Sequence, residues 1–183
     1  QHVSFAYPEA GENVLTDISF KAKKGQTIAV IGSTGSGKST LINLIPRYYD
    51  VTKGSVKVDG VDVRDMTQKE LRDKLGYVPQ KGVLFSGTID SNIRYGKPEI
   101  TDAQVKEAAE VAQATEFIDT KPEKYESPVS QGGTNVSGGQ KQRLSIARAI
   151  AKDPEIFIFD DSFSALDFKT DSQLRKALKE YTK

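Results

Sequence analysis

The sequence predicts an α/β fold with a parallel core, an antiparallel β appendage and an inserted helical subdomain. Two nearly continuous apolar runs, Gln26–Ile31 and Ile156–Phe159, predict strands that are covered on both faces, which is typical of a parallel sheet. Short segments of alternating polarity near the start of the chain predict half-buried antiparallel strands. Helical patterns lie between the two apolar runs, as in a βαβ arrangement.

Length and charge exclude several classes of protein. A chain of 183 residues buries roughly 70% of its unfolded surface, so it needs no disulfide or metal staple, and it contains no Cys. Its 26 Lys and Arg residues balance 25 Asp and Glu residues, which argues against nucleic acid as a main partner. No apolar run approaches the roughly 20 residues of a membrane-spanning helix. We therefore expect one domain, or one core with a small attached subdomain.

The antiparallel appendage is predicted from three segments. Val3–Tyr7 alternates apolar and polar residues, and Val14–Lys21 and Ser55–Val63 are short strand-like segments. Asp59-Gly60 is typical of a two-residue hairpin turn inside the third segment.

Three helices are predicted to begin at capping boxes. The boxes are Thr101-x-x-Gln104, Ser137-x-x-Gln140 and Thr170-x-x-Gln173. Apolar residues at helical spacing follow each of them, and the second helix is expected to run toward Pro154. The stretch of about 81–136 contains no strong strand pattern, so it is expected to be helical and loop-like.

The phosphate-binding motif is complete. The segment Gly32-Ser33-Thr34-Gly35-Ser36-Gly37-Lys38-Ser39 matches G-x-x-x-x-G-K-[ST], between an apolar run and the helical pattern that begins at Thr40. In this motif backbone N–H groups cradle phosphate, the Lys reaches the β- and γ-phosphates, and the Ser binds Mg²⁺. Thr40 stands where a dinucleotide fingerprint requires its third glycine. We therefore predict that Gly32–Thr40 bind a nucleoside triphosphate.

An acidic residue after a buried strand is the second half of such a site. Asp160 follows Ile156–Phe159 directly and is predicted to hold Mg²⁺ through water, together with Ser39.

The remaining motifs resemble those of ATP-binding cassette (ABC) proteins. Val136-Ser137-Gly138-Gly139-Gln140 is similar to the LSGGQ signature, and Ser164-Ala165-Leu166-Asp167 resembles the D-loop of that family. The order is that of the family, namely phosphate loop, Gln80, signature, Asp160 and D-loop. Tyr7 stands where the family places an aromatic ring that stacks on adenine. Over essentially its whole length the chain resembles the nucleotide-binding domain of an ABC transporter.

This resemblance implies a P-loop NTPase (RecA-like) core with an antiparallel β subdomain and an inserted α-helical subdomain. One nucleotide-binding domain would occupy residues 1–183, truncated at both ends. The β subdomain and P-loop core would span about 1–80, the helical subdomain about 81–150, and the core would continue over 151–183.

The resemblance also implies roles for individual residues. Ser137, Gly138, Gly139 and Gln140 would bind the γ-phosphate of an ATP held by a second cassette, so that two cassettes sandwich two ATP molecules. Gln80 would contact Mg²⁺ and face the coupling helix of the protein's own transmembrane domain. Lys38, Gln80 and Asp161 would be the catalytic residues. The cassette would lie at the cytoplasmic face of the cell membrane and take part in no nucleic-acid binding.

Subtype features resemble those of one half of a heterodimeric multidrug exporter. The segment 79–93 is similar to the exporter version of the Q-loop region. Asp161 stands where hydrolytic cassettes carry a Glu that acts as general base, and its carboxylate has about 1.5 Å less reach. His2 is the only histidine, and the chain ends before the position of the family's switch His. No acidic residue occurs near Gln131, where many homodimeric exporters have one. We therefore expect a non-identical partner cassette and a slow ATP site on this chain.

Two alternative functions compete with this interpretation. A non-transport ABC clamp acting in DNA repair or translation would need a long coiled coil or a basic stripe, yet only about 100 residues separate phosphate loop and signature and the net charge is +1. A structural partner that binds ATP without hydrolysing it is the other alternative, because Asp161 is a poor base.

Overall fold

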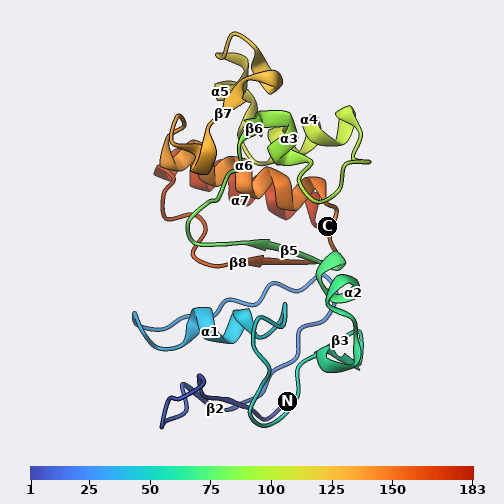
Figure 1. Ribbon diagram of the computed structural model, residues 1–183, viewed down its shortest axis with the longest axis vertical. Helices are drawn as coiled ribbons and strands as arrows, with labels where there is room; N and C mark the ends of the chain where they lie inside the picture. Colours follow the sequence, from blue (N-terminus) through green and yellow to red (C-terminus); the bar gives the residue numbers. More distant parts are fainter. The chain divides into compact units, whose positions relative to one another are not determined.

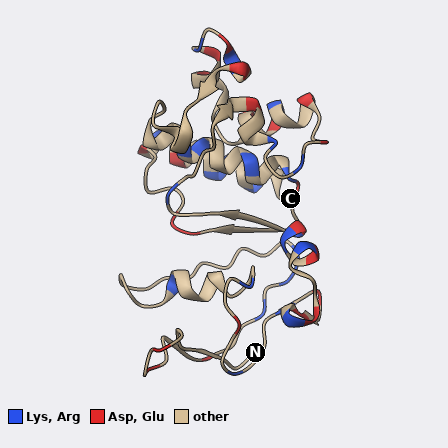
Figure 2. Ribbon diagram, in the orientation of Figure 1, with Lys and Arg blue, Asp and Glu red and all other residues tan.

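The structure, a computed structural model, describes every residue from Gln1 to Lys183 (Figure 1). Its contacts divide the chain into two compact units, Gln1–Leu75 and Gly76–Lys183. No helix in either unit combines the length and the apolar character that crossing a bilayer requires. Lys and Arg positions are interspersed with Asp and Glu positions along the ribbon of each unit (Figure 2).

The first unit is built from short elements. They are β1 (Val3–Phe5), β2 (Leu15–Ile18), α1 (Lys38–Asn43), β3 (Lys57–Val58), β4 (Val61–Asp62), the 3₁₀ turn η1 (Val63–Asp65) and α2 (Gln68–Asp73). β1 pairs antiparallel with β2, and β3 with β4. The predicted hairpin at Asp59-Gly60 is confirmed, since both residues have positive φ, 51° and 81°, and directly join β3 to β4.

A small apolar core holds this unit together. Val3, Phe5, Leu15 and Leu44 are all buried, which places α1 against the β1–β2 pair. Thr67 opens α2 with a full capping box, and Leu71 is completely buried behind it. The predicted strands of this appendage therefore form, although they are shorter than the patterns suggested.

The prediction of a buried strand at Gln26–Ile31 is wrong in this structure. The segment has no regular secondary structure and is exposed throughout, with Ile31 91% exposed. The sheets pair β1 with β2, β3 with β4, β5 with β8 and β6 with β7, and none includes this segment. An apolar sequence indicates only that a segment can be buried. A strand also needs a neighbouring strand that pairs with its backbone N–H and C=O groups.

The second unit contains most of the helices. Its elements are β5 (Leu75–Val78, beginning one residue before the unit), β6 (Gly87–Thr88), α3 (Ile89–Ile93), α4 (Asp102–Val111), α5 (Thr115–Asp119), η2 (Lys124–Glu126), β7 (Pro128–Val129), η3 (Gln131–Gly133), α6 (Gly138–Ala151), β8 (Ile156–Phe159) and α7 (Phe168–Tyr181). The predicted strand β8 forms, and it pairs with β5, which the sequence pattern did not reveal. The two arrows point the same way in Figure 1.

Two of the three predicted helix starts are confirmed. Thr101 and Ser137 each accept the backbone N–H three residues later, and the Gln there reaches back to the cap, as in a capping box. The third is wrong, because α7 begins earlier, with Asp167 as its cap. The Asp167 carboxylate accepts from the N–H and the hydroxyl of Thr170, so the predicted cap residue is itself inside the helix.

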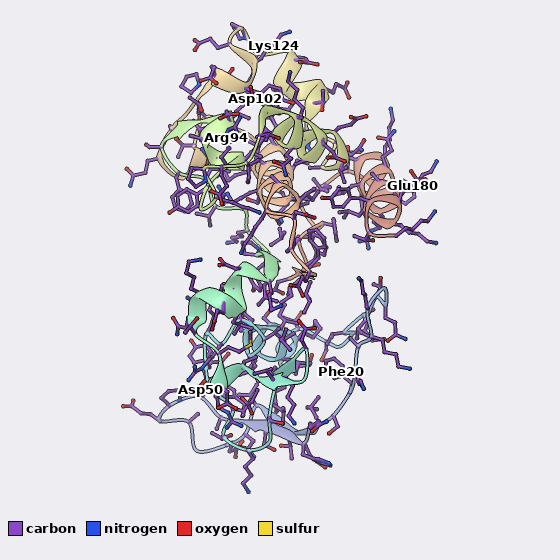
Figure 3. The ribbon with its side chains drawn as sticks, turned by 90° about the vertical axis from the view of Figure 1, so that its right-hand side faces the viewer. Phe20, Asp50, Arg94, Asp102, Lys124 and Glu180 are labelled. Carbon is purple, nitrogen blue, oxygen red and sulfur yellow. The ribbon has the colours of Figure 1, made fainter.

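The core of the second unit is centred on α6. Leu144, Ile146 and Ile150 are buried on this helix, which packs against α3 and α4. Arg94, directly after α3, forms an ion pair with Asp90 of that helix (2.7 Å) and a second one with Asp102, the first residue of α4, so it links the two helices. Figure 3 labels Arg94 and Asp102. This helical packing fixes the start of α6, where the predicted signature lies.

Candidate functional site

The predicted phosphate loop is an exposed segment that runs directly into α1. Lys38 is the first residue of the helix, and its Nζ folds back to donate hydrogen bonds to the carbonyl oxygens of Gly32 (2.6 Å) and Ser33 (2.8 Å). Within the loop the Ser36 N–H donates to the Ser33 carbonyl at 3.1 Å. Lys38 therefore closes the loop and holds its ammonium group beside the backbone that is predicted to bind phosphate.

Two glycines of this loop are constrained, Gly37 by its backbone conformation and Gly32 by a close side chain. Gly37 precedes α1 with φ 93°, a conformation that side chains rarely adopt, and no side chain caps the helix. A Cβ on Gly32 would lie 2.5 Å from the Oγ of Ser36. Helix N-termini that follow a glycine-rich loop in this manner bind phosphate groups. The loop as folded thus fits the phosphates of a nucleotide, and the Ser39 hydroxyl in the same turn is an oxygen ligand of the kind that Mg²⁺ prefers.

Tyr7 and Thr40, two predicted nucleotide-binding residues, are in direct contact. Their hydroxyl groups lie 2.7 Å apart, with Thr40 buried and Tyr7 half-buried. The Tyr7 ring also meets Phe5 and Tyr49 edge to face, at centroid distances of 4.9 and 5.3 Å. These contacts fix the ring relative to α1, while its predicted stacking on adenine stays a prediction.

The predicted metal-binding carboxylate stands at the end of β8 in the second unit. The backbone N–H of Asp160 donates to the carbonyl of Val78, the last residue of β5, at 3.0 Å. The hydroxyl of Ser162, which is fully buried, donates to the same carbonyl at 2.7 Å. The carboxyl ends of the two strands are thereby locked together, so the segments that follow them are neighbours.

Gln80 and Asp161 are brought together by this arrangement. The Gln80 side-chain amide donates to the Asp161 carboxylate at 3.3 Å, and this contact lies at the exposed edge of the unit. Asp161 has φ 46°, in the left-handed region that Asp and Asn tolerate better than most other residues. The predicted base is therefore oriented by an amide donor and lies on a turn that favours a short side chain.

The predicted signature forms the start of α6. Ser137 caps the helix, with its Oγ accepting the Gln140 N–H at 3.1 Å, while the Gln140 side chain accepts the Ser137 N–H at the same distance. A Cβ on Gly138 would meet nothing within 4 Å. A Cβ on Gly139 would lie 3.3 Å from the carbonyl oxygen of Ala165, so the predicted signature contacts the segment predicted to be the D-loop. No contact within the chain therefore explains why residue 138 is a glycine.

Asp167, the last residue of the predicted D-loop, is the N-terminal cap of α7. Asp167 accepts the backbone N–H and the hydroxyl of Thr170, and these hydrogen bonds hold the pKa of the Asp167 carboxyl below its usual range. It is therefore a carboxylate at neutral pH, at the N-terminus of α7.

Sequence reasoning missed two residues beside the site. Gln142 is 1% exposed on α6, where it accepts the Gly82 N–H (2.8 Å) and donates to the Pro79 carbonyl (3.0 Å). Gly82 lies so close to α6 that a Cβ would fall 2.8 Å from the carbonyl of Lys141. The signal that was available is helical spacing, because Gln142 stands four residues before the buried Ile146 on the same helix.

A partly buried arginine organises the segment after Gln80. Arg148 donates to the carbonyls of Asn92 (2.8 Å) and Val83 (2.9 Å), and burial lowers the pKa of Arg148 to about 10. Its guanidinium also lies over the rings of Phe85 and Tyr95, which stack at 4.2 Å. Val83, Phe85 and Tyr95 are themselves 50%, 39% and 56% exposed, so they form an apolar surface, named here the 83–95 surface.

Comparison with known proteins places these features in one family. The family described as "ABC transporter" matches residues 15–164. Two Bacillus subtilis (strain 168) relatives are "Putative multidrug export ATP-binding/permease protein YgaD", 47% identical over 183 residues, and "Uncharacterized ABC transporter ATP-binding protein YfiB", 48% identical over 181 residues. These alignments cover 100% and 99% of this chain and 32% of each relative.

A solved structure is similar as well. The structure of a bacterial Atm1-family ABC exporter with ATP bound superposes with a TM-score of 0.94 and 38% sequence identity, covering 100% of this chain and 32% of that one. The chain therefore spans about a third of the length of the proteins it matches.

Proposed function

Because the chain belongs to the ABC transporter family and has its P-loop NTPase fold, we propose that it is the ATP-binding and ATP-hydrolysing cassette that powers substrate export by a membrane transporter. The observation that carries the proposal is the complete phosphate loop, closed by Lys38 on the Gly32 and Ser33 carbonyls ahead of an uncapped helix. A single cassette would occupy residues 1–183, with its helical subdomain at about 81–150.

Different residues of the chain would bind the phosphates, the adenine and the Mg²⁺ ion of MgATP. Gly32–Thr40 would hold the phosphates of ATP, with Lys38 neutralising their charge, and Tyr7 would support the adenine. Ser39, Gln80 and Asp160 would hold Mg²⁺ through oxygen ligands, directly or through water. Bound MgATP supplies the phosphoanhydride bond whose hydrolysis drives transport.

Asp161 would be the residue that accepts a proton from water. Gln80 already orients its carboxylate by a hydrogen bond, but the side chain is one methylene shorter than the Glu of hydrolytic cassettes. A displacement of about 1 Å at a catalytic group costs on the order of 100-fold in rate. Hydrolysis at this chain's own site would therefore be slow.

A second cassette would complete each ATP site. The N-terminus of α6, with Ser137, Gly138, Gly139 and Gln140, would bind the γ-phosphate held by that partner. An open approach at Gly138 supports this role, because nothing in the chain fills the space beside it. The partner would be non-identical, since an impaired base on this chain calls for a competent site elsewhere.

The Gln80 region would dock on the protein's own transmembrane domain. Support comes from the exposed 83–95 surface, which Arg148 holds rigid immediately after Gln80 in the chain. An apolar surface of this kind suits a helix that inserts from a neighbouring domain. The cassette would accordingly lie at the cytoplasmic face of the cell membrane.

The test is MgATP binding and turnover by the full chain, alone and mixed with a candidate partner cassette. We expect saturable MgATP binding by the chain alone, slow hydrolysis alone and faster hydrolysis in the mixture. The proposal fails when the chain binds no MgATP at any tested concentration. A mixture that binds MgATP without turnover supports the non-hydrolysing alternative instead.

A further inference from the structure

The loop that carries Gln80 is fastened at three places to the elements around it. Before it, the Val78 carbonyl accepts from the Asp160 N–H and the Ser162 hydroxyl. Within it, the Pro79 carbonyl and the Gly82 N–H are both bound by one side chain, that of Gln142 on α6. Gln80 itself stands between the two groups that Gln142 holds.

Gln142 is unusual among the polar residues of α6. Its side chain is 1% exposed, and both ends of its amide are used, one as donor and one as acceptor. A buried amide that satisfies two backbone groups of one loop imposes a position on that loop, because leaving either group unpaired would carry a desolvation penalty. Gly82 also approaches α6 closely, since a Cβ at this residue would lie only 2.8 Å from both the Lys141 carbonyl oxygen and the Ser145 hydroxyl. The loop is therefore seated against the helix.

We propose that Gln142 is a positioning residue that holds the 79–82 loop on α6, keeping Gln80 in contact with Asp161 and joining it mechanically to the signature at the start of the same helix. Gln142 lies five positions after Ser137, the cap of the same helix, so a movement of the signature would be carried to the loop by this amide. The proposal rests on the proposed function for its catalytic consequence, but not for the loop contact itself.

The first measurement is hydrogen exchange of the Gly82 amide in the full chain without nucleotide, by NMR. Although Gly82 lies outside any helix or strand, we expect its amide to exchange at least about tenfold more slowly than an unstructured peptide. Exchange at the unstructured rate in the wild-type chain overturns the proposal, whether or not any variant folds.

Two variants then separate the two ends of the bridge. Gln142→Met keeps the length of the side chain but removes both hydrogen bonds, so the Gly82 amide should lose its protection. Gln142→Glu keeps an acceptor for the Gly82 N–H, so protection should persist. Gln173→Met, on the exposed face of α7, is the matched control and should leave Gly82 unchanged.

Turnover supplies the second readout. With its partner cassette and MgATP, Gln142→Met should lower kcat about tenfold while KM for MgATP stays within about twofold, because Gly32–Thr40, Ser39 and Asp160 would still bind MgATP when Gln80 alone is displaced. Protected wild-type Gly82 with an unchanged kcat in Gln142→Met overturns the positioning role. Absence of any wild-type turnover instead counts against the proposed function. In that case the hydrogen exchange of the Gly82 amide still tests whether Gln142 holds the 79–82 loop.

Discussion

The side-chain amide of Gln80 donates a hydrogen bond to the carboxylate of Asp161 at 3.3 Å, across 81 residues of sequence. The two residues follow the ends of the paired strands β5 and β8, and that pairing is what brings them together. Asp161 is the candidate base and Gln80 a candidate Mg²⁺ ligand. The hydrogen bond therefore connects two residues whose roles were predicted independently from the sequence.

Asp161→Glu is expected to raise MgATP turnover at this chain's own site, by roughly 10- to 100-fold, because the longer side chain brings the carboxylate within reach of water. The measurement is turnover of the chain mixed with its partner cassette. Asp161 has φ 46°, so the change should also cost about 1 kcal/mol in the free energy of unfolding.

Asp161→Asn is the control for this experiment, since it keeps the size of the side chain and removes the carboxylate. It should turn over no faster than wild type. A loss of hydrolysis in Asp161→Glu, with wild type active alone, would show that Asp161 is an adequate base as it stands and would favour a homodimeric transporter.

Lys38→Met should abolish MgATP binding in the tested range, because it removes both the charge and the hydrogen bonds to the Gly32 and Ser33 carbonyls. Isothermal titration calorimetry on the full chain measures the effect. Lys106→Met, on the exposed face of α4, removes the same charge elsewhere and should bind MgATP like wild type. Equal affinity in the two variants would exclude the phosphate-binding role of Lys38.

Gly138→Ala should stabilise the isolated chain by up to about 1 kcal/mol, because Ala is the better helix former and a Cβ at 138 meets nothing within 4 Å. The same change should reduce partner-dependent turnover at least about tenfold, since the added methyl group would block close approach of the partner's phosphate. Chemical denaturation and turnover of the mixture are measured together. Stabilisation with full turnover would mean that no ligand approaches this glycine.

Arg148→Lys should lower the free energy of unfolding by about 2 kcal/mol, because Lys cannot reproduce the planar fork that bonds both the Asn92 and the Val83 carbonyls. Urea denaturation of the full chain is the measurement. Arg175→Lys on α7 is the matched control, since that side chain is 59% exposed and its pair with Asp171 lies on the surface. Equal stability of the two variants would contradict the structural role of Arg148.

Asp62 should contribute a pH-dependent part of the stability. The Arg64 guanidinium bonded to it holds the pKa of the Asp62 carboxyl at about 2, below that of the unfolded chain. A depressed folded-state pKa stabilises the fold above the unfolded pKa of about 3.9, and that contribution disappears as the pH falls through about 2.

Asp62→Asn tests this contribution, because Asn can still accept the Arg64 N–H while carrying no charge. Wild type should exceed the variant in free energy of unfolding by about 0.5–1 kcal/mol at pH 6, as for an ion pair that solvent still screens in part, and the difference should shrink toward about pH 3. Denaturation curves across this range give the comparison. A difference that stays constant with pH would assign the effect to packing.

Local signals in the sequence were sufficient for much of the fold. The capping boxes at Thr101 and Ser137 and the hairpin at Asp59-Gly60 depend on neighbours within a few residues, and all three form as predicted. The predicted cap of α7 was three residues too late, because Asp167 offers a stronger local acceptor than Thr170. These features need no distant partner, which is why a linear pattern can reveal them.

By itself, then, the sequence determined the phosphate loop, the signature at a helix start and the family to which both belong. Only the tertiary structure decided that β5 pairs with β8, that Gln26–Ile31 forms no strand, and that Gln142 rather than a loop residue holds the segment around Gln80. The physical reason is that strands and buried polar side chains depend on partners far along the chain, and a linear pattern shows what a residue can do without showing what it meets.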